Sequence, residues 1–283
     1  MYFDVIFLGF GSISALVARG LIQEGKKIAI ITRMKNSILP KQISFIDKAS
    51  LFDWDEVIFK EFKSEKAFVV WRDCDFTSSS KKRDIQMNNW LFSDQFQTRE
   101  LIHLSSASVY KASRAIRSET SPIQDNSPKR KVENVLRELM KTKECAVTNL
   151  RISNIYGDSI KSGFIFNCLE ALEKRKNLEV FENLDIERDY LYVDDLVQAI
   201  LNLPDEYCLE RVVNISTGIG TRVSKILELI LEFSGYKPLI QFVQAPEKIQ
   251  ETCILSCEKL KGLIAWNPKT IDEGLHLLVP GKK

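Results

Sequence analysis

The chain has 283 residues, of which 45% are hydrophobic, and its 40 basic and 38 acidic residues leave a formal net charge of +2. This length suffices for one large α/β domain or two small ones without disulfides or structural metals. The charges are spread along the chain, so the sequence argues against a nucleic-acid-binding protein that depends on a basic surface.

The histidine and cysteine content argues against a metal centre. Only His103 and His276 are present, and the six cysteines have no metal-binding spacing, Cys253 and Cys257 being the nearest pair. We therefore expect reduced structural thiols. No apolar run reaches the about 20 residues that a membrane-spanning helix needs, and the N-terminus lacks the basic start of a signal peptide. These features predict a cytoplasmic protein with no membrane partner.

In the first half of the chain, apolar runs of strand length alternate with segments of helical periodicity, a pattern typical of a parallel sheet covered on both faces. Strands are predicted at residues 4–8, 27–32, 43–46, 67–71, 101–105 and 146–152, and helices at residues 12–24 and 128–142. These elements predict an α/β domain with a doubly wound parallel sheet over residues 1–155.

The pattern changes after about residue 155 to that of a smaller α/β lobe. Helices are predicted at residues 163–175 and 223–234, with short strands near 178–181, 188–193, 212–215 and 239–243. We expect residues 156–283 to form this lobe, with residues 188–202 returning to the first domain.

The segment from Gly9 to Ser14 reads Gly-Phe-Gly-Ser-Ile-Ser and lies between a predicted strand and a predicted helix. In this context the glycine spacing predicts a dinucleotide-binding turn. Gly9 permits the tight turn, Gly11 allows close approach of a pyrophosphate, and Ser12 and Ile13 supply amides at the helix start. The third position is Ser14, whose small side chain keeps helix and strand close and whose hydroxyl could reach a phosphate. The alternative is a tight turn without a ligand.

The residue after the second predicted strand bears on the cofactor. An acidic side chain there would bind the adenosine ribose hydroxyls, but the sequence has Arg33 after Thr32. A cation suits a 2′-phosphate, which favours NADP over NAD. The alternative is an ordinary surface arginine.

Past residue 100, five short motifs follow one another. They are residues 104–110 (Leu-Ser-Ser-Ala-Ser-Val-Tyr), Glu119 before Pro122, residues 150–157 (Leu-Arg-Ile-Ser-Asn-Ile-Tyr-Gly), residues 187–195 (Glu-Arg-Asp-Tyr-Leu-Tyr-Val-Asp-Asp) and residues 214–218 (Asn-Ile-Ser-Thr-Gly). In this order they resemble the extended short-chain dehydrogenase/reductase family, which includes nucleotide-sugar epimerases, dehydratases and 4-ketoreductases. The resemblance implies a Rossmann-like sheet, a substrate-binding C-terminal lobe, an NADP or NAD cofactor and a nucleotide-sugar substrate.

The resemblance also implies roles for single residues. Ser106 matches the catalytic serine that hydrogen-bonds the substrate oxygen being oxidised or reduced. Asn154 and Arg188 match positions near the substrate's diphosphate, and Tyr156, from the same motif as Asn154, is expected on the substrate side as well. The alternatives are a loop cap for Asn154 and a surface ion pair for Arg188.

The family's catalytic tyrosine and lysine, spaced as Tyr-x-x-x-Lys, do not occur in this sequence. In the family the ammonium lowers the pKa of the phenol, so that the phenol shuttles a proton near neutrality. Taking Lys129 as the lysine puts Asp125 in the tyrosine's place, and taking Lys131 puts Ser127 there. We therefore expect an atypical proton relay.

Neither residue replaces a tyrosine simply, because an aspartate of ordinary pKa, about 3.9, is already ionised at neutral pH and a serine holds its proton too tightly. Tyr110, four residues after Ser106, could substitute if its side chain turns toward the substrate. Burial could also raise the pKa of Asp125 enough to make it an acid.

Two further residues are expected along the path of the cofactor. Ser105 directly precedes the catalytic position, and Trp71 opens a loop, Trp-Arg-Asp-Cys-Asp, where the family has small apolar residues under the ribose and phosphates. The bulk of Trp71 and Arg72 could narrow this path, or Arg72 could bind a phosphate.

Three hypotheses follow for the whole chain. The first is an NAD(P)-dependent epimerase, dehydratase or ketoreductase acting on a nucleotide sugar; the second is an inactive regulatory protein that still binds dinucleotide or nucleotide sugar; the third is a structural subunit that binds neither. The helix predicted at residues 128–142 has two possible roles. It could form the contact of a homodimer, or all its apolar residues could face the sheet.

Overall fold

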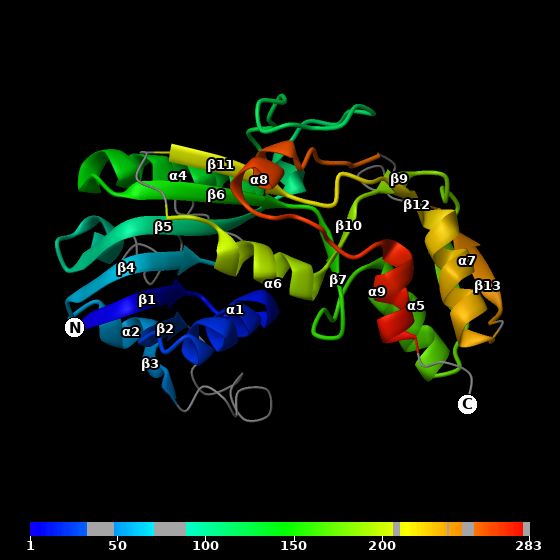
Figure 1. Cartoon of the computed structure of the whole chain (residues 1–283), viewed down its shortest axis with the longest axis horizontal. Helices are drawn as coiled ribbons and strands as arrows, with labels where there is room; N and C mark the ends of the chain where they lie inside the picture. The colour runs from blue at the N-terminus through cyan, green and yellow to red at the C-terminus, as the bar shows by residue number, and fades with distance from the viewer. Residues whose placement is uncertain (33–47, 71–88, 206–209, 237, 245–251, 280–283) are drawn as a thin grey trace. The chain divides into compact units, whose positions relative to one another are not determined.

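The computed structural model describes residues 1–32, 48–70, 89–205, 210–236, 238–244 and 252–279. Figure 1 shows the helices and strands coloured by position along the chain, which divides into two units. Unit 1 comprises Met1–Val109, Ile123–Arg151 and Leu203–Val213, and unit 2 comprises Tyr110–Pro122, Ile152–Asn202 and Asn214–Lys283.

A seven-stranded sheet forms most of unit 1. Its strands are β1 (Tyr2–Leu8), β2 (Ile28–Thr32), β3 (Ser50–Asp53), β4 (Phe62–Val69), β5 (Phe96–Ser106), β6 (Ala146–Ile152) and β11 (Glu210–Ile215). They lie in the order β11-β6-β5-β4-β1-β2-β3, and β1 pairs in parallel with both β2 and β4. The predicted doubly wound α/β fold is therefore confirmed.

The strand order of this sheet identifies where a ligand would bind. From β1 the chain proceeds to β2 and β3 on one side, and then to β4, β5 and β6 on the other. Ligands of such sheets bind at the carboxyl ends of the strands, where the order reverses. The glycine turn follows β1 directly, so it lies at this switch point.

The helices of unit 1 that the structure describes in full are α1 (Ser12–Gln23), α2 (Trp54–Val57) and α4 (Pro128–Lys143). Pro128 at the first position and two lysines in the last turn are typical of the two ends of α4. The apolar residues of α4 face the core, since Val132, Leu136 and Leu139 are fully buried. The apolar stripe of α4 thus faces the sheet, and a homodimer through this helix stays a prediction.

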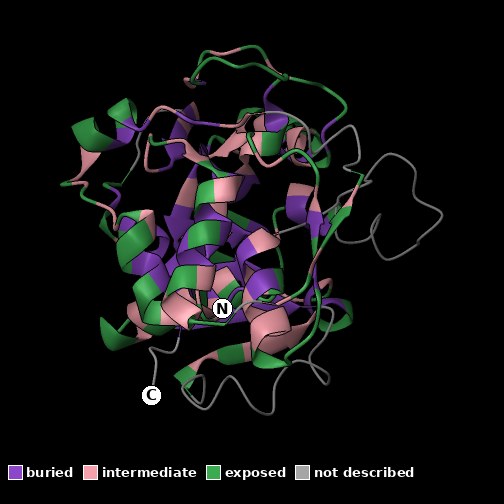
Figure 2. Ribbon diagram, turned by 90° about the vertical axis from the view of Figure 1, so that its right-hand side faces the viewer, coloured by how far each residue is buried: buried purple, intermediate pink, exposed green. Residues whose placement is uncertain are grey.

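Unit 2 consists of short paired strands and helices. The pairs are β7 (Asn154–Tyr156) with β10 (Tyr190–Tyr192), β9 (Glu187–Arg188) with β12 (Thr221–Arg222), and β8 (Leu178–Phe181) with β13 (Ile240–Val243). The helices are α5 (Phe164–Glu173), α6 (Val193–Asn202), α7 (Val223–Ser234), α8 (Glu258–Leu263) and α9 (Ile271–Leu278). In Figure 2 single helices carry both buried and exposed residues, as helices with one face in a core do.

Some elements differ from the sequence predictions. The strand predicted at residues 43–46 lies outside the described residues, whereas β3 forms at Ser50–Asp53, where none was predicted. The strand predicted at residues 188–193 is divided into β9 and β10, and α6 begins at Val193. The helices α8 and α9 were not predicted.

Within the described part of the chain, no helix is long and apolar enough to cross a membrane. Among the same residues, no group of three or more histidine, cysteine, aspartate or glutamate side chains could hold a metal ion. The described cysteines, Cys145, Cys168, Cys253 and Cys257, are free thiols.

Candidate functional site

The turn after β1 contains two glycines, and only the backbone conformation of Gly9 favours glycine over other residues. Gly9 has a φ of +94°, a conformation that favours glycine, and its amide donates to the carbonyl of Ile31 at 2.8 Å. Gly11 is extended, with a φ of −160°, and a Cβ added there would meet no described atom within 4 Å. The open space beside Gly11 is what the close approach of a pyrophosphate needs.

The start of α1 completes a site for an anion. The amides of the first helical turn, which begins with Ser12 and Ile13, have no acceptor within the helix. They also lie at the positive end of the helix dipole. Ser12 is exposed and Ile13 is half-buried, so the turn can be reached from solvent. These features fit the pyrophosphate of a dinucleotide.

Ser14 shapes the turn itself. Its side chain is fully buried, the amide of Gly11 donates to its Oγ at 2.7 Å, and its hydroxyl donates to the carbonyl of Gly11 at 2.9 Å. The small, buried side chain leaves room for α1 to pack against the sheet. The structure directs its hydroxyl into the turn rather than toward a phosphate.

The carboxyl end of β5 carries Ser105 and Ser106, whose side chains have different surroundings. Ser105 is buried, and its hydroxyl donates to Oε1 of Glu133 at 2.8 Å. A contact from Ser105 to a cofactor would therefore come from its backbone. Ser106 is half-buried, and its Oγ accepts the amide of Ser108 at 3.2 Å, at the start of the 3-10 helix η2 (Ala107–Val109).

Lys129 lies in the first turn of α4 and contacts the same strand end. Its Nζ donates to the carbonyl of Leu104 at 2.8 Å, two residues before Ser106. The structure thus brings Lys129 to the end of the strand that carries Ser106, and the catalytic roles of both residues stay predictions.

Asp125 precedes α4 and is not part of the helix. Its side chain is 87% exposed, and Nε of Arg130 lies 3.9 Å from its Oδ1. The burial on which an acid role for Asp125 depends is therefore absent. For the alternative spacing, Lys131 is exposed, while Ser127 is 5% exposed and its hydroxyl has no hydrogen-bond partner among the described residues.

Tyr110 is held inside unit 2. It is 3% exposed, and its hydroxyl donates to Oδ1 of Asn214 at 2.6 Å. Asn214 is itself fixed, because its side-chain Nδ2 donates to the carbonyl of Arg117 and its backbone amide donates to Oε1 of Glu119. Turning Tyr110 toward a substrate would break this buried contact, and its catalytic role stays a prediction.

The residues expected near a diphosphate lie in unit 2. Asn154 donates through Nδ2 to the carbonyl of Asp189 at 3.2 Å, and Arg188 pairs with Thr221 between β9 and β12. The intervening Asp189 is fully buried and accepts from the amides of Thr217 and Gly218, both at 3.0 Å. Sequence reasoning named Asp189 only as a possible partner of Arg188 in a surface ion pair, whereas the structure buries its carboxylate. It holds the loop that follows β11.

Tyr156 lies in the core of unit 2. It is 3% exposed and packs edge to face against Tyr192, with ring centroids 5.4 Å apart. Burial raises the pKa of its hydroxyl. Packing accounts for this side chain, and the substrate contact expected of it stays a prediction. Arg33 and Trp71, expected near the cofactor, lie outside the described residues.

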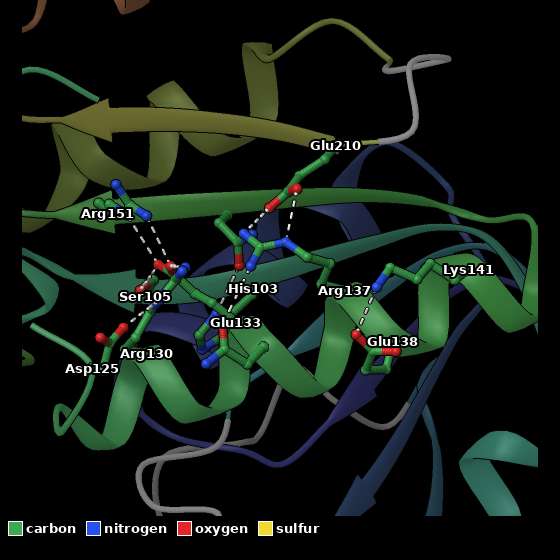
Figure 3. A network of polar contacts seen from close by, with 12 residues as sticks. His103, Ser105, Asp125, Arg130, Glu133, Arg137, Glu138, Lys141, Arg151 and Glu210 are labelled. Carbon is green, nitrogen blue, oxygen red and sulfur yellow. Dashed lines mark hydrogen bonds and ion pairs between the residues drawn. The ribbon is translucent and has the colours of Figure 1, made fainter. Parts of the chain in front are cut away.

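Glu133 is the centre of a buried network that sequence reasoning missed (Figure 3). Its carboxylate is fully buried and accepts from Nε and Nη2 of Arg151 at 3.0 and 2.8 Å, from Nη1 of Arg130 at 3.0 Å and from Ser105. Burial alone opposes the charged form, but these hydrogen bonds hold the pKa of Glu133 below its ordinary value. The sequence signal was a charged residue, Arg151, within the predicted strand at residues 146–152.

His103 lies next to this network, as Figure 3 shows. It is fully buried on β5, with Nδ1 3.1 Å from Oδ1 of Asn149 on β6. Burial, helped by the charge of Lys129, lowers the pKa of His103 to about 3. The ring is therefore neutral at neutral pH.

The sheet order, the glycine turn at the switch point and the amide-lined start of α1 are the features by which α/β proteins typically bind dinucleotides. The chain belongs to the NAD dependent epimerase/dehydratase family, whose model matches residues 9–216. This confirms the resemblance to extended short-chain dehydrogenase/reductases at the level of the family.

Among curated proteins, the chain is similar to dTDP-4-dehydro-6-deoxyglucose reductase from Escherichia coli, with 27% identity over 152 residues. This match covers 52% of the chain and 48% of the reductase, so the chain matches about half the length of that relative.

Solved structures of the same fold include UDP-glucose 4-epimerase from Thermotoga maritima, with a TM-score of 0.77 and 21% identity over 98% of this chain and 97% of that chain. UDP-glucuronic acid 4-epimerase from Bacillus cereus gives a TM-score of 0.78 and 16% identity, with 98% of each chain covered. At these identities the similarity establishes the fold.

Proposed function

We propose that this chain binds a nicotinamide dinucleotide at the Gly9–Ser14 turn and acts as an oxidoreductase-type epimerase, dehydratase or ketoreductase on a nucleotide-activated sugar. The observation that carries this proposal is the open space at Gly11 beside the amides of α1, at the switch point of the sheet. The sugar substrate is supported by the family and by the named substrates of the similar reductase and epimerases.

We assign the residues of each unit to separate tasks. In unit 1, the half-buried hydroxyl of Ser106 hydrogen-bonds the reacting oxygen of the sugar. The ammonium of Lys129 supplies positive charge at the carbonyl of Leu104, which lies two residues before Ser106 on β5. In unit 2, Arg188 and Asn154 bind the diphosphate. A bound nicotinamide would accept or supply the hydride.

The proton relay of this proposal is atypical. Asp125 stands in the tyrosine's place when Lys129 is taken as the lysine, and it is 87% exposed. An ionised carboxylate can accept a proton but is a poor donor near neutral pH. We therefore assign Asp125 the role of a base in exchange with solvent.

A second candidate is a binding protein without turnover. It is favoured by the position of Asp125 outside α4, because no side chain that readily donates a proton is then held one helical turn before Lys129. This candidate predicts stabilisation by dinucleotide with no hydride transfer.

For the cofactor we propose a preference for NADP, which rests on Arg33 in the sequence. Arg33→Glu should weaken the binding of NADP and leave that of NAD unchanged or stronger. Equal weakening of both forms would contradict the preference.

The test of the proposed function is a thermal-shift screen with NAD, NADP and nucleotide sugars, followed by hydride exchange with each sugar that gives a shift. A ligand at about 100 times its Kd stabilises the folded chain by about 2.7 kcal/mol. A shift with dinucleotide together with turnover supports the enzyme, and a shift without turnover supports the binding protein. No shift with either dinucleotide would refute the enzyme, and no shift with any of these ligands would refute both.

A further inference from the structure

The network around Glu133 joins the elements that carry the proposed catalytic groups. Glu133 and Lys129 are four residues apart on α4 and therefore lie on one face of the helix. Lys129 donates to the carbonyl of Leu104, and Glu133 accepts from the hydroxyl of Ser105. Two successive turns of α4 are thus attached to two successive residues of β5, directly before Ser106.

A third element fixes Glu133 itself. Arg151 of β6 donates to both carboxylate oxygens of Glu133, through Nε at 3.0 Å and Nη2 at 2.8 Å. The side chains of Arg151 and Glu133 are 2% and 0% exposed. This forked geometry restrains the orientation of the carboxylate as well as its position.

Stability alone does not explain why Glu133 and Arg151 are buried together. Burying two charges is costly, and apolar side chains of similar volume often stabilise a core equally well. What a carboxylate with four donors adds is direction, because each hydrogen bond fixes a neighbouring group within narrow limits. The groups fixed here are the end of β5, the first turns of α4 and the end of β6.

We propose that Glu133 is a positioning residue that holds Ser106 and Lys129 in register through Ser105 and Arg151. This inference rests on the proposed function for the roles of Ser106 and Lys129. The positioning itself is a property of unit 1 and can be measured without turnover.

The test uses Ser105→Ala, which removes one donor to Glu133 and leaves the buried pair with Arg151 in place. Thr148→Val is the matched control, because the hydroxyl of Thr148 donates to the buried carboxylate of Glu100 at 2.6 Å in the same sheet. Ser105→Thr keeps the hydroxyl and serves as the rescue variant. Glu133→Gln is the more severe variant.

The first readout is hydrogen exchange of the backbone amides, with global stability determined in parallel. We expect Ser105→Ala to accelerate exchange at residues 104–108 and 129–133 by about tenfold or more relative to the control, and Ser105→Thr to restore the wild-type rates. Equal exchange at these residues in Ser105→Ala and Thr148→Val, after correction for global stability, would show that Glu133 serves stability alone.

The second readout is dinucleotide affinity and, where turnover is found, the separation of kcat from KM. A displacement of about 1 Å in a reacting group costs about 100-fold in rate. We expect Ser105→Ala and Glu133→Gln to lower kcat with KM for the sugar nearly unchanged, and Thr148→Val to change neither. An equal loss in Thr148→Val would overturn the proposal.

The two inferences fail in different ways. If the wild-type chain binds no dinucleotide, the proposed function is wrong, and the exchange pattern alone decides whether Glu133 positions β5 and α4. If dinucleotide binds but the exchange pattern is uniform, the proposed function stands and the positioning role is wrong.

Discussion

His103 is a histidine that the folded chain keeps uncharged. Its ring is fully buried beside Asn149, with the cations of Lys129 and Arg151 and the carboxylate of Glu133 near it, and its pKa falls to about 3. In the unfolded chain an ordinary histidine has a pKa of about 6.5. Between these two values the unfolded state binds the additional proton, so stability decreases as the pH falls below about 6.5.

This difference predicts a loss of about 2 kcal/mol in the free energy of unfolding between pH 7 and pH 5. His103→Gln removes the titrating group and should flatten the curve over this range. Urea unfolding of both proteins at the two pH values measures the difference. Identical pH dependence in the variant and the wild type would mean that the ring is not buried as a neutral group.

Asp125 offers a direct test of the proton relay. Asp125→Tyr places a phenol four residues before Lys129 and recreates Tyr-x-x-x-Lys. If the missing phenol limits the reaction, the substitution should raise kcat by about 10²-fold, the lower end of what a positioned proton donor contributes. Adding Ser106→Ala to this variant should abolish the gain. An unchanged or lower kcat in Asp125→Tyr, with dinucleotide still bound, would show that the missing phenol does not limit the reaction.

At the scale of elements, the ring of Tyr156 leaves no room for a side chain at Gly274 of α9. A Cβ at Gly274 would lie 2.7 Å from Cζ of Tyr156, closer than a real Cβ approaches other atoms. Gly274→Ala should therefore destabilise the chain by about 1–3 kcal/mol, although alanine is the better helix former. Thermal or urea unfolding measures this change.

The control for this prediction is Gly262→Ala in α8, where a Cβ meets nothing within 4 Å. This substitution should be neutral or stabilising. Adding Tyr156→Phe to Gly274→Ala should recover part of the loss, since the hydroxyl is the atom that the new methyl group meets first. Equal stability of the two alanine variants would contradict the packing of α9 against Tyr156.

The elements that the sequence predicted well are those with a long periodic pattern. The strand Ala146–Ile152 and the helix Val223–Ser234 form with the predicted bounds, and so, against this trend, does the four-residue strand Leu178–Phe181. The missed elements are short or lack a boundary signal. Strand β3 has four residues, and α6 follows β10 with no glycine or proline between them. For α9 a signal was present, because Thr270 and Glu273 form a capping box.

Within the candidate site, local sequence was informative where a single segment makes the contact. The turn at Gly9–Ser14 is built by consecutive residues, so its shape could be predicted. The pairing of Glu133 with Arg151 joins a helix to a strand, and nothing in either segment alone specifies the partner. The same holds for Tyr110 and Asn214, which are 104 residues apart and whose contact turns Tyr110 inward.

At the scale of the whole molecule, the family and the fold are established by independent comparisons, whereas the activity depends on the dinucleotide site. Similar folds carry different chemistry, so the sugar and the reaction have to be decided at the site. Every catalytic assignment proposed for this chain presupposes that a dinucleotide occupies the turn after β1.

The most direct measurement of that claim is the dinucleotide affinity of Gly11→Ala by calorimetry. The extended backbone tolerates alanine, and the added Cβ meets no described atom, so the free energy of unfolding should stay within about 1 kcal/mol of the wild type. The methyl group would, however, fill the space that the pyrophosphate needs. We predict that dinucleotide binding is lost in Gly11→Ala and retained in Gly262→Ala. Equal dinucleotide affinity in Gly11→Ala and the wild type would contradict the binding of a dinucleotide at the turn after β1.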